Sequence, residues 1–349
     1  MRVLFIGQAG TRVAWFRAVL PSLFLDGDWC TVSGDPPGLR LAASWVDHAT
    51  QEPDMLSYDV VVVQQVRGLR WMELIKKLQR AGVRVLYETD DWLSGVRDVH
   101  DHEFKAQFTK EHDKEIRYCM RACDGMIVST KFLRDKYRPK TDRPIYVCEN
   151  GLDLGRYRLG RPDRGQVSGR ETVTILWSGA TGHQSAVLPW IGSVIRVMQR
   201  VPHTSFVTIG KNYADMIGES FKDRTLSIPF GPLETYPSAM TAGDVSIAPS
   251  GTTDWHRAKS QLRVMESMAL GIPVVASEHY RETIDEYGGG YIVSGDPTSR
   301  LQELVEDDEL RTRLGDEARV TAHTNFGMDR RVEAWKTALT EAVERPPVR

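Results

Sequence analysis

Short runs rich in β-branched residues recur along the chain and end at small or polar residues. In the first half they occupy residues 2–7, 59–64, 83–89, 125–129 and 145–148. Between most of them lie segments with apolar residues at helical spacing, such as 71–79 and 104–122. Strands that alternate with helices form a parallel sheet covered by helices on both faces. The pattern predicts an α/β fold.

The alternation stops once and then starts again. Residues 155–171 are rich in glycine and arginine and contain almost nothing to bury, which is typical of a linker. Further strand-like runs follow at 173–177, 205–209, 226–230, 244–249, 272–277 and 291–294. We therefore predict two doubly wound domains, at 1–155 and 172–327, joined by a linker at 156–171. A length of 349 residues suits two domains. Residues 328–349 are expected to form a closing amphipathic helix.

The composition is that of an ordinary globular protein. Hydrophobic residues make up 41% of the chain and charged residues 26%, and the formal net charge is −2. A basic domain that grips a nucleic-acid backbone is not indicated. The sequence contains no long apolar run, and its opening strand is too short for a secretory signal. Its four cysteines form no C-x-x-C pair. We expect a cytoplasmic protein with reduced thiols.

The loop after the run at 173–177 is a candidate phosphate site. In open α/β sheets ligands bind beyond the carboxyl ends of the strands. Gly179 and Thr181 lie there, directly before a helical segment that starts after His183. Glycine lets backbone N–H groups approach an anion, and a helix N-terminus favours negative charge. Lys211, after the next strand, is a possible helper. The alternative is a tight turn without a ligand.

The segment 259–277 carries the most chemical information. Ser260 is expected to cap a helix that Gly271 ends, which places Lys259 at the positive end of that helix, where it can hold a diphosphate. Glu266 lies two turns inside, on an otherwise apolar surface, and vicinal sugar hydroxyls can supply the donors that its carboxylate needs. The alternative is that Glu266 pairs with Arg263 or Lys259 on a solvated face.

The end of this segment resembles a known family. Residues 266–277 read E-S-M-A-L-G-I-P-V-V-A-S, which is similar to a signature of the GT-B glycosyltransferases, especially the retaining family 4 group, the glycosyl transferases group 1. The N-G-L-D at 150–153, the G-D-V-S-I-A-P-S at 243–250 and the G-Y-I-V at 290–293 resemble further elements of that group in the same order. The resemblance covers nearly all of the second domain.

The resemblance implies two Rossmann-like domains that face each other across a cleft. It implies that the C-terminal domain binds a nucleotide-sugar, with Glu266 on the ribose, that the N-terminal domain binds most of the acceptor, and that the last helix crosses back to the first domain. Two departures stand out. The family's first glutamate is replaced by Ala258, and its usual arginine and lysine near the phosphates are missing. Lys259, in a K-S pair with Ser260, is the candidate replacement and suggests a subfamily.

Asp90 and Asp91 follow the run at 83–89, where the family often has a His-Asp pair that faces the donor sugar. Adjacent carboxylates raise each other's pKa, so the pair can act in catalysis or orient sugar hydroxyls. The alternative is that one of them caps the next segment. The histidines at 100, 102 and 112 meet no standard metal-ligand spacing, and we interpret their acidic surroundings as an acceptor-side loop.

These observations predict a glycosyltransferase that moves a sugar from a UDP- or GDP-sugar to an acceptor, with retention and without a metal or another cofactor. The sequence leaves a glycan, a lipid, a protein, a small metabolite or a modified nucleic-acid base open as the acceptor. Two alternatives remain: a nucleotide-sugar epimerase of the same fold, and a nucleotide-sugar-binding protein without catalytic activity.

Overall fold

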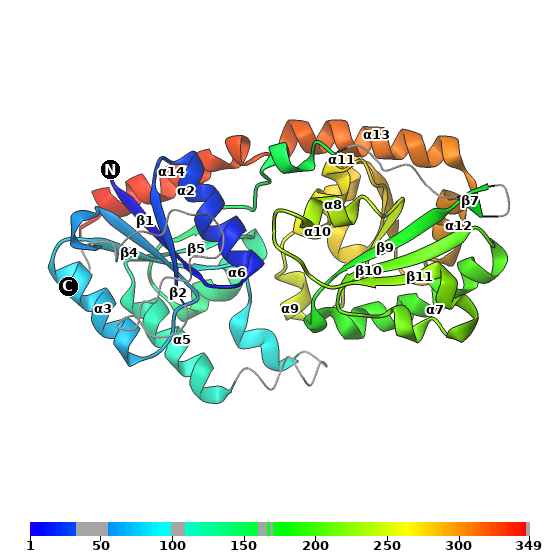
Figure 1. Cartoon of the computed structure of the whole chain (residues 1–349). Helices are drawn as coiled ribbons and strands as arrows, with labels where there is room; N and C mark the ends of the chain where they lie inside the picture. The colour runs from blue at the N-terminus through cyan, green and yellow to red at the C-terminus, as the bar shows by residue number, and fades with distance from the viewer. Residues whose placement is uncertain (33–54, 99–108, 160–165, 168–169, 347–349) are drawn as a thin grey trace.

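The computed structural model of the chain describes residues 1–32, 55–98, 109–159, 166–167 and 170–346. It contains two parallel six-stranded sheets, each with helices on both faces, which lie side by side (Figure 1). This confirms the predicted α/β fold with two doubly wound domains. In the described part of the chain, no helix combines the length and the apolarity needed to cross a membrane.

The first sheet has the order β2-β1-β3-β4-β5-β6. Its central strands are buried, largely apolar runs that lie within one or two residues of their predicted positions. The edge strand β2 was not predicted. The strands are β1 (Val3–Gln8), β2 (Asp28–Val32), β3 (Val60–Gln64), β4 (Arg84–Thr89), β5 (Gly125–Val128) and β6 (Ile145–Val147).

One helical segment after β1 contains a π-helical turn, η1 (Trp15–Val19), between α1 (Arg12–Ala14) and α2 (Leu20–Phe24). Such turns often occur at functional sites. The other principal helices of this domain are α3 (Leu69–Arg80), α5 (Lys110–Ala122) and α6 (Lys131–Tyr137). The short turns η4 (Leu93–Asp98) and η6 (Leu154–Tyr157) follow β4 and β6.

The second sheet has the order β11-β10-β9-β12-β13-β14. Its strands are β9 (Val173–Gly179), β10 (Thr204–Gly210), β11 (Thr225–Ile228), β12 (Val245–Ala248), β13 (Val274–Ser277) and β14 (Gly290–Val293). Its helices are α7 (Gln184–Arg200), α8 (Tyr236–Met240), α9 (Asp254–Arg257), α10 (Leu262–Ala269), α11 (Arg281–Tyr287), α12 (Thr298–Glu306) and α13 (Asp308–Asn325). Before β9, the predicted linker contains a small hairpin of β7 (Gln166–Val167) and β8 (Arg170–Glu171).

The last helix, α14 (Met328–Glu344), packs on the first domain, while the preceding α13 lies along the second (Figure 1). The rings of Trp335 and Phe5 meet edge to face, with centroids 5.8 Å apart. At the crossing point, the backbone of Leu152 exchanges hydrogen bonds with Phe326 and Met328. A Cβ atom on Gly151 would lie 2.7 Å from the Cα atom of Met328, so this crossing requires the glycine of the N-G-L-D motif.

Candidate active site

A cavity of about 530 Å³ lies between the two domains, beyond the carboxyl ends of β4 and β9. Parallel sheets bind ligands at these strand ends. The cavity is lined from the first domain by Gly10, Arg12, Val13, Phe16, Asp90 and Asn150, and from the second by Ser178, Gly179, Ala180, His183, Phe230, Gly231, Tyr236, Lys259, Ser260, Leu262, Arg263, Glu266 and Tyr280. Most of the predicted site residues therefore meet in one place.

The predicted phosphate loop lies in the wall of this cavity. Gly179 ends β9, and His183 directly precedes the seventeen-residue helix α7. Burial lowers the pKa of His183 well below its ordinary value, and the charges of Arg263 and Lys259 lower it further. The imidazole is thus neutral, and its buried Nδ1 atom has no hydrogen-bond partner in the described structure.

Two other residues predicted for this loop have different positions. Lys211 follows β10, where its backbone N–H donates to the carbonyl of Gly179 at 3.0 Å. Its side chain is not among those that line the cavity. Thr181 opens a short 3-10 turn, and its side chain lies outside the described part of the structure.

Ser260 does not cap a helix, so that prediction was wrong. The helix α10 begins two residues later, at Leu262, after the N-cap residue Gln261. The reason is the preceding helix α9, which ends at Arg257 and leaves a turn in which the backbone N–H of Lys259 donates to His256. Ser260 instead accepts a hydrogen bond of 2.8 Å from the Asn150 side chain of the first domain.

Glu266 is buried in α10, with 3% of its surface exposed. Its Oε1 atom accepts hydrogen bonds of 2.8 Å from both Arg12 and Tyr157. The Arg12 guanidinium also lies over the ring of Tyr236, 3.4 Å from its centroid. Burial raises the pKa of Glu266, while Arg12 and Tyr157 oppose the rise. The alternative of a solvated pair with Arg263 or Lys259 was therefore wrong.

Lys259 and Asp91 come from different domains and form an ion pair across the interface. The Lys259 Nζ atom also lies 4.1 Å from the ring centroid of Trp255. Lys259, which was predicted to bind the donor, and Asp91, which was predicted to act in catalysis, are therefore in direct contact. The ammonium group of Lys259 already has a carboxylate partner in this structure.

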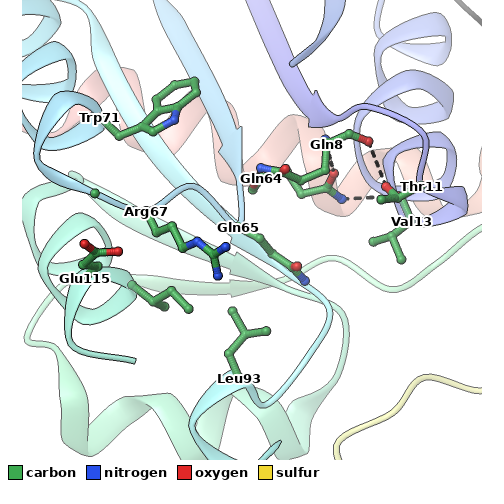
Figure 2. Close-up of a pocket in the computed structure, with 11 residues that line it drawn as sticks. Gln8, Thr11, Val13, Gln64, Gln65, Arg67, Trp71, Leu93 and Glu115 are labelled. Atoms are coloured by element: carbon green, nitrogen blue, oxygen red, sulfur yellow. Dashed lines mark hydrogen bonds between the residues drawn. The ribbon is translucent and has the colours of Figure 1, made fainter. Parts of the chain in front are cut away.

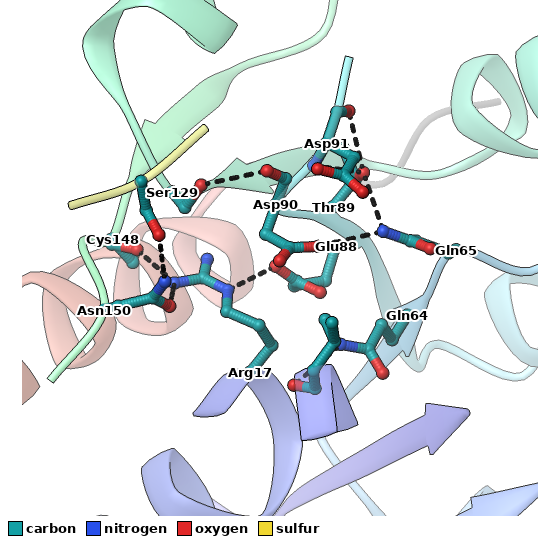
Figure 3. A network of polar contacts seen from close by, with 12 residues as sticks. Arg17, Gln64, Gln65, Glu88, Thr89, Asp90, Asp91, Ser129, Cys148 and Asn150 are labelled. Carbon is teal, nitrogen blue, oxygen red and sulfur yellow. Dashed lines mark hydrogen bonds and ion pairs between the residues drawn. The ribbon is translucent and has the colours of Figure 1, made fainter. Parts of the chain in front are cut away.

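Asp90 directly follows β4 (Figure 3) and is one of the residues that line the cavity. Its Oδ1 atom accepts a hydrogen bond of 2.9 Å from the Gln65 side chain. Burial, followed by the charges of Asp91 and Glu88, raises the pKa of Asp90 to about 8. The two aspartates thus direct their carboxylates toward Gln65 and Lys259. A carboxyl group with a pKa near neutrality can take or give a proton under ordinary conditions.

A buried ion pair between Arg17 and Glu88 lies at the end of β4, next to the two aspartates (Figure 3). Arg17, in the π-helical turn, donates from Nε to Glu88 at 2.6 Å, and both side chains are fully buried. It also donates to the Cys148 carbonyl at 2.6 Å and to the Asn150 side chain at 3.0 Å. Since Asn150 donates to Ser260, the network continues into the second domain.

A second cavity of about 580 Å³ lies within the first domain (Figure 2). Val13 lines both cavities, and Gln65, in the wall of the second, donates to Asp90 in the wall of the first. Asp90 therefore lines the first cavity and contacts a wall residue of the second. The second cavity is lined by Gln8, Thr11, Val13, Gln64, Gln65, Arg67, Gly68, Trp71, Leu93, Glu115 and Ile116.

The predicted histidine loop is only partly described. His100 and His102 lie outside the described residues. His112 takes part in a capping box with Thr109 at the start of α5. Within the described ranges, no three His, Cys, Asp or Glu side chains gather in a way that could hold a metal ion. The four cysteines are buried and free.

Sequence reasoning missed Arg12, Arg17, Gln65 and Tyr157. Arg17 offered a signal, because it is a lone cation among apolar helical residues and such a residue needs an internal partner. Tyr157 lies in the predicted linker, where nothing in the local pattern suggests burial. Arg12 and Tyr157 act across the interface, so their partner Glu266 is more than a hundred residues away in sequence.

Two Rossmann-like domains that face each other across such a cavity define the GT-B fold. Residues 172–306 match the family model described as Glycosyl transferases group 1. Spore coat protein SA of Bacillus subtilis (strain 168) is 31% identical over an alignment of 241 residues, which covers 60% of this chain and 60% of that protein. The chain thus spans less than two thirds of this relative.

Solved structures share the fold. A glycosyltransferase from Rickettsia africae ESF-5 aligns with a TM-score of 0.60 at 12% identity and covers 99% of both chains. A mutant of TarM from S. aureus, in complex with fondaparinux, alpha-GlcNAc-glycerol and UDP, aligns with a TM-score of 0.56 at 15% identity. That alignment covers 80% of this chain and 55% of TarM. At these identities the likeness shows the fold alone.

Proposed function

We propose that this protein is a glycosyltransferase that moves a sugar from a UDP- or GDP-sugar to a hydroxyl group of an acceptor. The observation that carries the proposal is the position of Asp90, which lines one cavity and accepts a hydrogen bond from Gln65 in the wall of a second. A transferase needs two substrates that meet at one reacting carbon. The family match over residues 172–306 supports the same reaction class, and the TarM structure contains UDP.

The first cavity suits the nucleotide part of the donor. Phe230 stands in its wall with 40% of its surface exposed and offers an aromatic face to a base. Both hydrogen bonds to Glu266 end on Oε1, which leaves Oε2 to accept from a ribose hydroxyl. The diphosphate would then lie near Gly179 and the N-terminus of α7, where backbone N–H groups and the helix dipole favour negative charge.

The second cavity suits the acceptor. Its lining is rich in amide and charged side chains, among them Gln8, Arg67 and Glu115, which can bind hydroxyl groups. An acceptor held there reaches the donor sugar beside Asp90. Its oxygen forms a bond to the anomeric carbon while the bond from that carbon to the diphosphate breaks. In the retaining reaction that we propose, the acceptor proton passes to the departing diphosphate on the same face.

The residues contribute to this reaction mainly through charge. Cations and helix N-termini stabilise the leaving diphosphate, which gains negative charge in the transition state. Asp90 orients sugar hydroxyls, because a protonated carboxyl group can both donate and accept hydrogen bonds. No metal ion is assigned a role in the proposed reaction, and no cofactor besides the donor is needed.

The test begins with thermal shifts in the presence of UDP- and GDP-linked sugars, because a ligand that binds the folded state raises its stability. The stabilising donor is then incubated with acceptors of several classes, and the products are identified by mass spectrometry. We expect donor consumption that depends on an added acceptor. Conversion of the donor without an acceptor would favour an epimerase. Binding with neither transfer nor hydrolysis would favour a non-catalytic protein.

A further inference from the structure

Three cationic side chains line the cavity between the domains, namely Arg12, Lys259 and Arg263. Two of them already have carboxylate partners. Arg12 donates to Glu266 at 2.8 Å, and Lys259 forms an ion pair with Asp91. Their charges are therefore largely neutralised by the protein itself.

Arg263 differs from the other two. It is half-buried on α10, and none of the described carboxylates lies within ion-pair distance of it. Its contacts are a long hydrogen bond of 3.4 Å from Nη1 to the Pro249 carbonyl and the ring of Trp177, whose centroid is 5.8 Å from Cζ. The charge of Arg263 lowers the pKa of buried Glu266, but the two side chains do not form an ion pair, so the guanidinium donors remain available to a ligand.

Gly179 makes room for this guanidinium. A Cβ atom at position 179 would lie 2.8 Å from the Arg263 Nη2 atom and 2.7 Å from the Trp177 ring. The arginine head therefore lies against the backbone at the end of β9, beside the N-terminus of α7. Arg263 also helps keep neighbouring His183 neutral. The wall thus combines a cation that has no direct ion pair with the positive end of a long helix.

The geometry points to Arg263 as the residue that binds the diphosphate of the donor. This inference rests on the proposed function. It assigns to Arg263 the binding of the diphosphate, which the sequence suggested for Lys259. The planar guanidinium can donate two parallel hydrogen bonds to phosphate oxygens. Lys259 would have to give up or share Asp91 to do the same, and that exchange reduces its net contribution.

The inference is tested by calorimetry with UDP, GDP, the two free nucleosides and inorganic pyrophosphate. The variants are Arg263→Gln, Arg263→Lys and Lys259→Gln. Arg313→Gln, which changes an exposed arginine of α13, is the control for net charge. We expect Arg263→Gln to lower the affinity for pyrophosphate, and for whichever of UDP or GDP the parent binds, by about ten- to a hundredfold. The matching nucleoside should bind as before. Arg263→Lys should keep part of the affinity, and Lys259→Gln should lose less than Arg263→Gln.

The failures can be told apart. If the parent binds UDP or GDP and Arg263→Gln binds it equally well, Arg263 is not the diphosphate ligand, although the proposed function stands. A larger loss in Lys259→Gln than in Arg263→Gln would return the role to Lys259. If the parent binds neither nucleotides nor pyrophosphate, the donor assignment and the inference both fall.

Discussion

Replacing Asp90 with asparagine should stabilise the protein at neutral pH while it impairs transfer. The unfolded chain loses the proton of this carboxyl group near its ordinary pKa of about 3.9. In the folded protein the pKa is raised to about 8, mainly by burial and by Asp91. Between these values the folded state holds a proton that the unfolded state has lost, so stability falls as the pH rises. Asp90→Asn removes this loss.

The size of the effect follows from the same numbers. One pKa unit corresponds to about 1.4 kcal/mol, so the loss at pH 7 is at most roughly 4 kcal/mol. Between pH 5 and pH 7.5, the stability of Asp90→Asn relative to the parent should therefore rise by up to roughly 3 kcal/mol. The asparagine amide oxygen can still accept from Gln65, so the variant keeps its local hydrogen bond.

Guanidinium unfolding at pH 5 and pH 7.5 measures the stability difference, and Asp135→Asn, at an exposed position of α6, is the control. Transfer should fall by orders of magnitude with nearly unchanged nucleotide affinity, because the nucleotide is assigned to the other domain. An equal stability difference at both pH values would refute the raised pKa. Transfer within about threefold of the parent would refute a catalytic role for Asp90.

Two further substitutions test the buried charges. Glu266→Gln should weaken nucleoside binding, and it should lower the free energy of unfolding by about 1–3 kcal/mol because Arg12 loses a charged acceptor. Calorimetry measures the first effect and guanidinium unfolding the second. An unchanged nucleoside affinity would show that Glu266 does not bind the ribose. Arg17→Met should cost about 3–5 kcal/mol, since it leaves the buried Glu88 carboxylate without its cation. Adding Glu88→Gln to that variant should restore part of the loss, and no recovery would show that the arginine acts mainly through its other contacts.

The strands could be predicted from the sequence because most of them are buried on both faces. A continuous run of β-branched residues, such as the four valines at 60–63, favours a strand that is buried on both faces of a sheet. Strand β2 escaped prediction because Asp28–Val32 is an edge strand of mixed polarity and depends on its parallel pairing with β1. Tertiary contacts rather than local pattern decide such a segment.

The position of the site was predictable because parallel strands direct their following loops to one edge. Asp90 and His183 follow strands, Gly179 ends one, and all three line the cavity. Their partners were not predictable in this way. Whether Lys259 meets a phosphate or Asp91 depends on how two separately folded domains are docked, and one chain's local pattern contains no information on that docking.

The cross-domain pairs also bear on how a donor would bind. Lys259 contacts Asp91 of the first domain, so a phosphate that binds Lys259 exchanges one polar contact for another and gains only the difference. Arg263 has no ion pair to give up, and a phosphate that binds it displaces no carboxylate. A phosphate on Lys259 would also loosen the contacts between the domains, because Asp91 would lose its partner as the ligand gains it. Binding of a donor through Lys259 and domain closure should therefore be coupled through this ion pair.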